Sequence, residues 1–152
     1  RMASPNCPCP PFLCEKLELT QKQAATLLHY RHVKLVCGQK VLSHAQNWYR
    51  PDRLSADMNT ELNTTETPFG RAVTQLAFTR QLVKAERLWA PLPNGWECAP
   101  LPIGTGARLT PPPWLLRHQA ILKRQDGAPF SAVTETYTAD LLHFTPPAVP
   151  LP

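Results

Sequence analysis

The fold is decided by residues 114–138, which read WLLRHQAILKRQDGAPFSAVTETYT. Two stretches rich in apolar and β-branched residues, Trp114–Lys123 and Pro129–Thr138, flank the dipeptide Asp126-Gly127. Aspartate followed by glycine tolerates the positive backbone angles of a tight hairpin turn, and such a pair between alternating runs is the strongest short-range hairpin signal. The segment therefore predicts two antiparallel strands.

A second hairpin is expected nearer the amino terminus. The run Val33–Cys37 has a strand-like composition, Gly38-Gln39-Lys40 follows as a turn, and a second run extends from Val41 to Tyr49. A further strand is expected from about Leu76 to Leu88. Together these runs predict an α+β domain whose antiparallel sheet has about five to six strands and is accompanied by a few helices.

Three helices are expected beside the sheet. Helix formers dominate from Thr20 to about Tyr30, and Thr20 is placed to cap the first turn through its hydroxyl. A short helix is expected near Asp57 to Leu62. The dipeptide Thr67-Pro68 marks a third helix start, with the threonine as N-cap and the proline at the first helical position, where its missing N–H costs nothing.

The length of the chain, 152 residues, suits one domain that buries roughly two-thirds of its unfolded surface. Proline-rich composition predicts tails at residues 1–14 and 146–152, on either side of a domain at residues 15–145. Pro91 to Pro113 is a long connection rich in proline and glycine. A loop of this length inside a small domain is usually functional or mobile.

Composition excludes several classes of protein. Apolar residues make up 43% and charged residues 18%, which is globular, and no run approaches the roughly 18 apolar residues of a membrane span. No secretory signal is recognisable at the start, so we expect a soluble protein in the cytoplasm, as a monomer or weak dimer. The net charge of +5 is spread along the chain without a nucleic-acid motif, so it suits an acidic small substrate better than a nucleic acid.

The cysteines and histidines predict no metal site. The five cysteines are an odd number, and the cluster of Cys7, Cys9 and Cys14 has no partner pair at zinc-finger spacing, so reduced thiols are expected. The five histidines also fall at no consistent metal spacing. We expect each to be structural or exposed; they are His29, His32, His44, His118 and His143.

Three features converge on the binding of a small anion. The helix start at Thr67 offers the backbone amides of Phe69, Gly70 and Arg71 to a carboxylate. Arg31, placed between the first helix and the first strand, could grip a carboxylate through two parallel hydrogen bonds. Glu135 shares a strand face with two apolar residues, so burial would raise its pKa toward acid–base duty if that face points inward. Each feature has a plainer explanation without a ligand. The helix start would then belong to a well-capped structural helix, Arg31 to a solvated surface and Glu135 to the exposed face of its strand.

A series of short motifs extends over about residues 15–145. They are Arg31-His32-Val33-Lys34-Leu35, Asp52-Arg53-Leu54, Thr67-Pro68-Phe69-Gly70-Arg71, Phe78-Thr79-Arg80, Arg117, Gly127-Ala128-Pro129 and Thr134-Glu135. In order and spacing this series resembles the chorismate lyase family. The resemblance implies a lyase that converts chorismate to 4-hydroxybenzoate and pyruvate by elimination, without a cofactor, for quinone (ubiquinone) biosynthesis. Chorismate carries two carboxylates on a non-aromatic ring, so aromatisation drives the reaction and the protein mainly holds and desolvates the substrate.

The resemblance also implies the roles of the site residues. Arg31 would pair with the ring carboxylate, the backbone at Phe69 and Gly70 would add a hydrogen bond, and Glu135 would orient or protonate the departing ether oxygen. Leu19 matches the position beside the family's first flap. Fewer residues separate Leu19 from Arg31 than in the family pattern, so this flap is expected to be shortened or missing. Candidates for the second carboxylate are Arg71, Arg80 and Arg117.

Two other functions fit the same residues. The effector-sensing domains of one class of bacterial repressors look similar in fold, and fold does not fix function. A non-catalytic domain that binds a small carboxylate is therefore the main alternative. Such domains normally follow a winged DNA-binding domain, and no such segment is recognisable before this one, so we expect the enzyme. The third reading is a scaffold that kept the pocket and lost the reaction.

Overall fold

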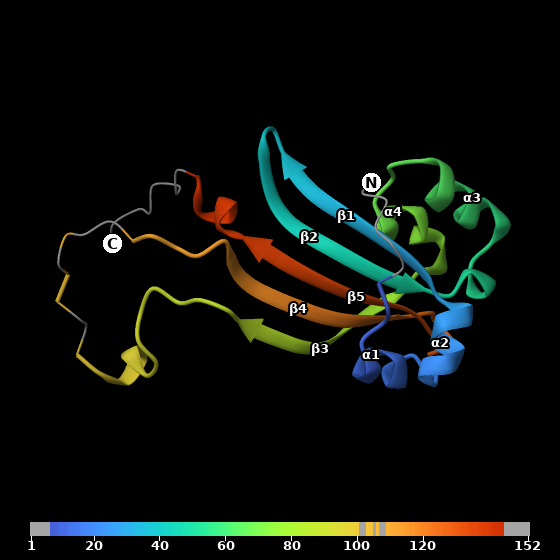
Figure 1. Cartoon of the computed structure of the whole chain (residues 1–152), viewed down its shortest axis with the longest axis horizontal. Coiled ribbons are helices and arrows are strands. Elements are labelled where there is room, and N and C mark those ends of the chain that lie inside the picture. The colour runs from blue at the N-terminus through green and yellow to red at the C-terminus, as the bar shows by residue number, and fades with distance from the viewer. Residues whose placement is uncertain (1–6, 101–102, 105, 107–108, 145–152) are drawn as a thin grey trace.

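The computed structural model describes residues 7–100, 103–104, 106 and 109–144, and within them the chain forms one five-stranded antiparallel sheet (Figure 1). The strand order is β1-β2-β5-β4-β3. The strands are β1 His29–Cys37, β2 Lys40–Tyr49, β3 Thr79–Arg87, β4 Trp114–Lys123 and β5 Pro129–Thr138. The helices are α1 Pro11–Lys16, α2 Gln21–Leu27, α3 Ala56–Thr64 and α4 Phe69–Ala72. This architecture confirms the predicted α+β class.

The hairpin of β4 and β5 has the bounds that the sequence predicts. Gly127 takes a φ of +82°, a left-handed conformation that glycine adopts without strain, and its amide donates to the Arg124 carbonyl at 2.9 Å. The Asp126 carboxylate accepts from the amide of Ala128 at 3.0 Å. The turn is thus held by its own aspartate and glycine.

The strand register divides the core into two clusters on opposite faces of the sheet. Trp48, Ala132 and Ile121 are cross-strand neighbours in one row, and Tyr49 and Leu122 lie in the next row. Adjacent residues of a strand point to opposite faces. The first row packs against α1 and α2, and the second packs against α3 and α4. We call these the α1 face and the α4 face.

Cys9, Leu13 and Cys14 belong to the core of the α1 face, which corrects the tail predicted for residues 1–14 as far as the structure describes them. Pro11 begins α1, where its missing N–H costs no hydrogen bond. Leu13, Cys14 and Leu17 are almost completely buried against the sheet. The proline-rich composition that suggests a tail therefore contains a helix start. The tail predicted at 146–152 lies outside the described residues.

The cap predicted for α2 is confirmed. The Thr20 hydroxyl accepts from the Gln23 amide at 3.2 Å, and the Gln23 side chain accepts from the Thr20 amide at 2.9 Å. The helix ends at Leu27, earlier than predicted, because β1 already begins at His29. Arg31 consequently lies inside a strand and not between a helix and a strand.

The start of β3 differs from the prediction, and the position of α3 agrees with it. The strand expected from Leu76 begins at Thr79, because Ala77 has a left-handed φ of 45° that interrupts extended structure. The short helix expected near residues 57–62 is α3, whose cap Ser55 accepts from the Met58 amide. Single-turn 3₁₀ helices occupy Pro51–Arg53, Thr74–Leu76, Trp96–Cys98 and Ala139–Leu142.

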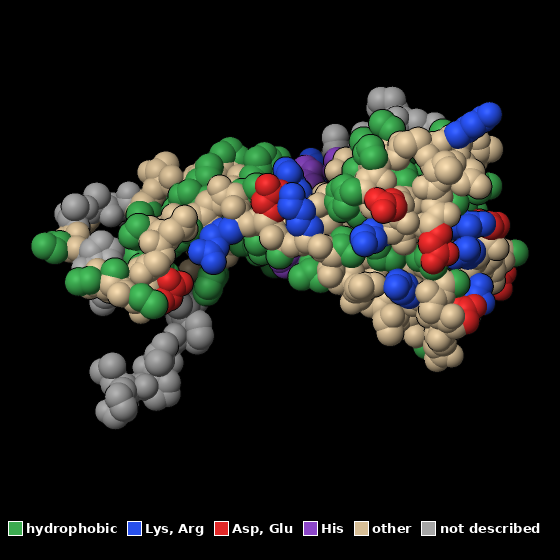
Figure 2. Space-filling model, turned by 90° about the horizontal axis from the view of Figure 1, so that it is seen from below, with side chains coloured by type: hydrophobic (Ala, Val, Ile, Leu, Met, Phe, Trp, Pro, Cys, Tyr) green, Lys and Arg blue, Asp and Glu red, His purple; other side chains and the backbone are tan. Residues whose placement is uncertain are grey.

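Helices cover only one end of the sheet, so the other end exposes apolar side chains (Figure 1). Leu35 and Val36, near the end of β1, are about half exposed there. Figure 2 shows hydrophobic side chains over the left-hand part of the molecule, and lysine and arginine side chains interleaved with acidic ones. On this face the basic residues form no single stripe, in agreement with the sequence.

The open end of the α1 face carries a histidine pair. His44 Nδ1 lies 3.3 Å from His32 Nε2, and the His44 ring packs edge-on against Trp114 at 5.2 Å between centroids. Burial lowers the pKa of both imidazoles below the usual value, and the Lys34 charge lowers both further. The folded chain therefore favours two neutral imidazoles.

Replacing Leu13 by Ala should lower the free energy of unfolding by about 2–5 kcal/mol, because the change leaves a cavity in the core. Phe12→Ala is the matched control, since Phe12 is the exposed neighbour on the same helix. Urea unfolding of the two variants measures the difference. Equal, small losses would mean that this segment is a tail after all.

Lowering the pH from 7.5 to 5 should destabilise the fold. The pKa values of His32 and His44 are lower folded than unfolded, so their contribution is present above about 6.5 and is lost as the pH falls through the folded values. Urea midpoints at both pH values measure the loss, which should shrink in the His32→Gln/His44→Gln variant. The pair has no such role if that variant keeps the full pH dependence.

Candidate functional site

A cleft lies on the α4 face, between α4 and strands β1, β2 and β5. Its main cavity has a volume of about 230 Å³, and a smaller cavity of about 170 Å³ adjoins it toward β3. The two cavities share four residues, namely Asn47, Phe69, Gly70 and Glu135. We call these joined cavities the α4 cleft. Other lining residues include Val33, Lys34, Ser43, Glu66, Phe78, Arg80 and Val133.

Glu135 has three polar partners around the α4 cleft. One carboxylate oxygen accepts from the Ser43 hydroxyl at 2.9 Å, and the other accepts from the Tyr137 hydroxyl at 3.0 Å. Arg80 lies 3.6 Å from the second oxygen. Burial raises the pKa of Tyr137, and its hydrogen bond to Glu135 raises it further, so the phenol remains a donor at neutral pH.

Arg80 gives the cleft an accessible cation. It lies near the start of β3, an edge strand, and its side chain is 42% exposed. The ion pair with Glu135 is long and has one contact, unlike a bidentate arginine–carboxylate pair. The guanidinium therefore retains donors that can bind an anion in the cleft.

Aromatic rings form one wall of the cleft. Phe69 packs against Tyr49 at 5.1 Å and against Phe130 at 6.4 Å between ring centroids. Phe78 packs edge-on against Phe130 at 6.0 Å. A Cβ added to Gly70 would meet the Phe78 ring at an ordinary 3.8 Å, so space does not require a glycine there.

The predicted cap of the third helix is wrong. Pro68, not Thr67, is the N-cap of α4 and makes no side-chain cap bond; the Thr67 amide donates instead to the Thr65 hydroxyl at 3.1 Å. The amide of Arg71, expected to be available for an anion, donates to the Pro68 carbonyl at 3.0 Å. With only four residues in α4, a helix dipole contributes little to this cleft.

Arg31 does not line the cleft. It is only 3% exposed, and its Nη2 donates to the Thr65 carbonyl at 3.3 Å. It lines a different cavity, with Tyr49 and Asn63 among its neighbours. The solvated arginine that was the plainer alternative is also wrong, because this guanidinium is buried beneath the segment between α3 and α4.

Two other predicted residues lie away from the cleft. Leu19 is buried in the cluster of the α1 face with Trp48. Arg117 lies one residue from His118, the cross-strand partner of Glu135, so its side chain points to the opposite face, where it pairs with Glu86 at 3.5 Å. Of the predicted site residues, the structure thus brings together Phe69, Gly70 and Glu135, and it adds Arg80 from the three candidate arginines.

Sequence reasoning missed the contribution of β2. Ser43, Ala45 and Asn47 line the cleft at alternate positions, and Ser43 and Asn47 are buried. No local pattern marks this face, because Ala45 interrupts its polar residues and the opposite face carries His44 and Gln46.

Neither a candidate metal centre nor a membrane-spanning helix occurs in the described ranges. No group of three or more histidine, cysteine or acidic side chains there could hold a metal ion. No described helix is long and apolar enough to cross a membrane.

No family model matches the chain. Over 119 residues it is 56% identical to the uncharacterized protein y4mC of Sinorhizobium fredii, a match that covers 78% of the chain and 50% of y4mC, so the chain spans about half the length of this relative. The C-terminal domain of Yurk from Bacillus subtilis aligns with a TM-score of 0.52 at 12% identity, over 88% of this chain and 84% of that domain.

Two further solved structures align less closely. They are a candidate transcriptional regulator, YydK of Bacillus subtilis (TM-score 0.49, 15% identity, 94% of this chain and 57% of that one), and the ligand-binding domain of a candidate GntR-family regulator of Bordetella bronchiseptica (TM-score 0.47, 17% identity, 88% and 79%). None of these proteins is named as a chorismate lyase, so that activity stays a prediction. The chain therefore shares the fold of the Yurk domain.

Proposed function

We propose that the α4 cleft binds a small organic acid and that the domain senses or carries this ligand without transforming it. The observation that supports this most directly is the accessible guanidinium of Arg80 beside a cavity walled by aromatic rings. Binding sites of this kind combine apolar walls with a few polar groups that fix orientation. With about 230 Å³, the main cavity suits a ligand of about one ring.

The ligand's carboxylate would bind Arg80. A partly exposed ion pair contributes little to stability, so a ligand carboxylate can replace Glu135 as the partner of Arg80 at small cost. The freed Glu135 keeps its hydrogen bonds from Ser43 and Tyr137 and can accept from a hydroxyl or amine of the ligand. Phe69 and Phe78 would contact the apolar part of the ligand.

Binding without reaction fits the site better than catalysis for two reasons. Arg31, expected to anchor the ring carboxylate, lies outside the cleft and is engaged with the Thr65 carbonyl. Both oxygens of Glu135 already accept hydrogen bonds from protein hydroxyls, which suits an acceptor better than the donor that a departing ether oxygen needs.

The lyase is the second candidate function. Its support is that Phe69, Gly70 and Glu135, three of the residues named by the family resemblance, line one cavity. If this function holds, Glu135 is the residue that acts on the ether oxygen and Arg80 is the available anchor for one carboxylate.

Arg80→Gln should weaken binding of 4-hydroxybenzoate by roughly tenfold to a hundredfold, because it removes a charge-assisted hydrogen bond of about 1.5–3 kcal/mol. Arg117→Gln is the matched control: this arginine also pairs with a glutamate and is 40% exposed against 42% for Arg80, but it lies on the α1 face. Calorimetry measures both affinities. An equal loss in the two variants would point to a general charge effect, and unchanged binding in Arg80→Gln would reject the anchor.

Incubation with chorismate should yield no 4-hydroxybenzoate or pyruvate above the uncatalysed rate, while calorimetry detects binding of the aromatic acid. Chromatography follows both products together. Equal amounts of both products, reduced by Glu135→Gln with product affinity retained, would establish the lyase and refute the binding-only proposal. Ser131→Ala is a suitable control, since Ser131 is buried outside the cleft.

A further inference from the structure

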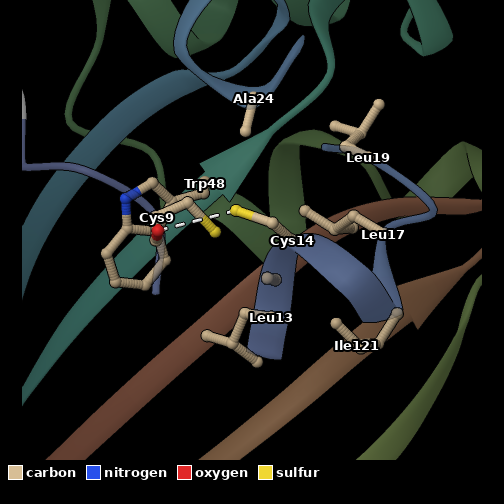
Figure 3. Close-up of a cluster of buried hydrophobic side chains, with 9 residues drawn as sticks. Cys9, Leu13, Cys14, Leu17, Leu19, Ala24, Trp48 and Ile121 are labelled. Atoms are coloured by element: carbon tan, nitrogen blue, oxygen red, sulfur yellow. Dashed lines mark hydrogen bonds between the residues drawn. The ribbon is translucent and has the colours of Figure 1, made fainter. Parts of the chain in front are cut away.

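Three of the five cysteines lie at the start of the chain, close to α1 and away from the α4 cleft. Cys9 and Cys14 are 7% and 1% exposed, and both belong to the core of the α1 face. The Cys14 thiol donates to the Cys9 carbonyl at 3.5 Å, and the two sulfur atoms point toward each other in Figure 3. All three cysteines are reduced in this structure.

We propose that Cys9 and Cys14 form a modification site: a buried dithiol that a low-molecular-weight disulfide oxidises to an intramolecular disulfide. The pair is preorganised, because the loop and helix that carry the two thiols are held independently of any bond between them. Trp48 Nε1 donates to the Cys7 carbonyl at 2.8 Å, which fixes the loop over β2. Leu13 and Leu17 fix α1 in the core.

A small oxidant can reach Cys9 but not Cys14. A cavity of about 170 Å³ opens beside the loop and is lined by Cys7, Cys9, Tyr30 and Trp48, among others. Cys14 does not line this cavity. Cys9 is therefore the attacking thiol and Cys14 the resolving thiol.

The exchange balances without any other reagent. The Cys9 thiolate attacks one sulfur of the small disulfide, whose S–S bond breaks and releases one thiolate. Cys14 then loses its proton and attacks the Cys9 sulfur, which expels the second small thiolate and forms the internal S–S bond. The protein loses two electrons and two protons, and the small disulfide gains them as two thiols.

The surroundings of Cys9 also set the pH dependence of the exchange. Burial, and next the interaction with the Cys14 thiol, raise the pKa of Cys9 well above the usual range for a thiol. Since the thiolate is the nucleophile, oxidation should be slow at neutral pH and should accelerate as the pH rises.

The test uses the full chain with Cys37→Ser and Cys98→Ser, which removes the two exposed cysteines and leaves Cys7, Cys9 and Cys14. The protein is incubated with glutathione disulfide at pH 7 and pH 9, and free thiols and intact mass are measured. We expect the free thiols to fall from three to one, with the mass of an internal disulfide and no bound glutathione, faster at pH 9. Far-UV circular dichroism should be unchanged, because the pair is already in place.

Single replacements in this background identify the pair. Cys7→Ala should still form the internal disulfide, whereas Cys9→Ala and Cys14→Ala should not. Cys14→Ala should instead accumulate a mixed disulfide with glutathione, which would show that glutathione disulfide reaches Cys9 in the folded variant. An internal disulfide that requires Cys7, three free thiols after oxidation at pH 9, or loss of the native spectrum on oxidation would each overturn the proposal.

Discussion

The pairing of β5 with β2 on one side and β4 on the other is the constraint on which the rest of the structure depends. It places Ala45, Glu135 and His118 in one cross-strand row and Asn47, Val133 and Ala120 in the next row of the same face. A shift of one residue in a strand would turn its side chains to the other face. Glu135 would then leave the cleft, and Val133 would leave the α4 face with it.

Burial at one end of the sheet secures this register. Trp48 and Ile121 pack under α1 and α2, while Tyr49 and Leu122 pack under α3 and α4, so both faces are sealed within a few residues of each other. A slip would expose both clusters to water at a cost of about 25 cal/mol per Å² of apolar area. The open end needs no such cover, because the register is already set where the helices lie (Figure 1).

The sequence predicted correctly those features that depend only on neighbouring residues. The Asp126-Gly127 turn and the flanking alternation gave the bounds of β4 and β5, and the Thr20 hydroxyl gave the start of α2. Arg31 was misplaced because its burial depends on a segment more than thirty residues away, at Thr65, which no local pattern encodes. Residues 9–14 were misjudged because proline content suggested a tail, although Pro11 at a first helical position is a helix signal.

The charges that line the α4 cleft decide which ligand it can hold. Its charged lining side chains are Arg80 against Glu66 and Glu135, because Lys34 pairs with His44 and its side chain points to the α1 face. Chorismate brings two carboxylates, which would need two cations free of acidic partners, whereas 4-hydroxybenzoate brings one carboxylate and a hydroxyl that can donate. A cleft with the one accessible cation Arg80 among its described lining residues accommodates the second ligand by exchanging the partner of Arg80, while Glu135 becomes the acceptor for the hydroxyl. Charge balance thus favours a singly charged acid that carries a donor, a preference that follows from the cleft itself and not from the family resemblance.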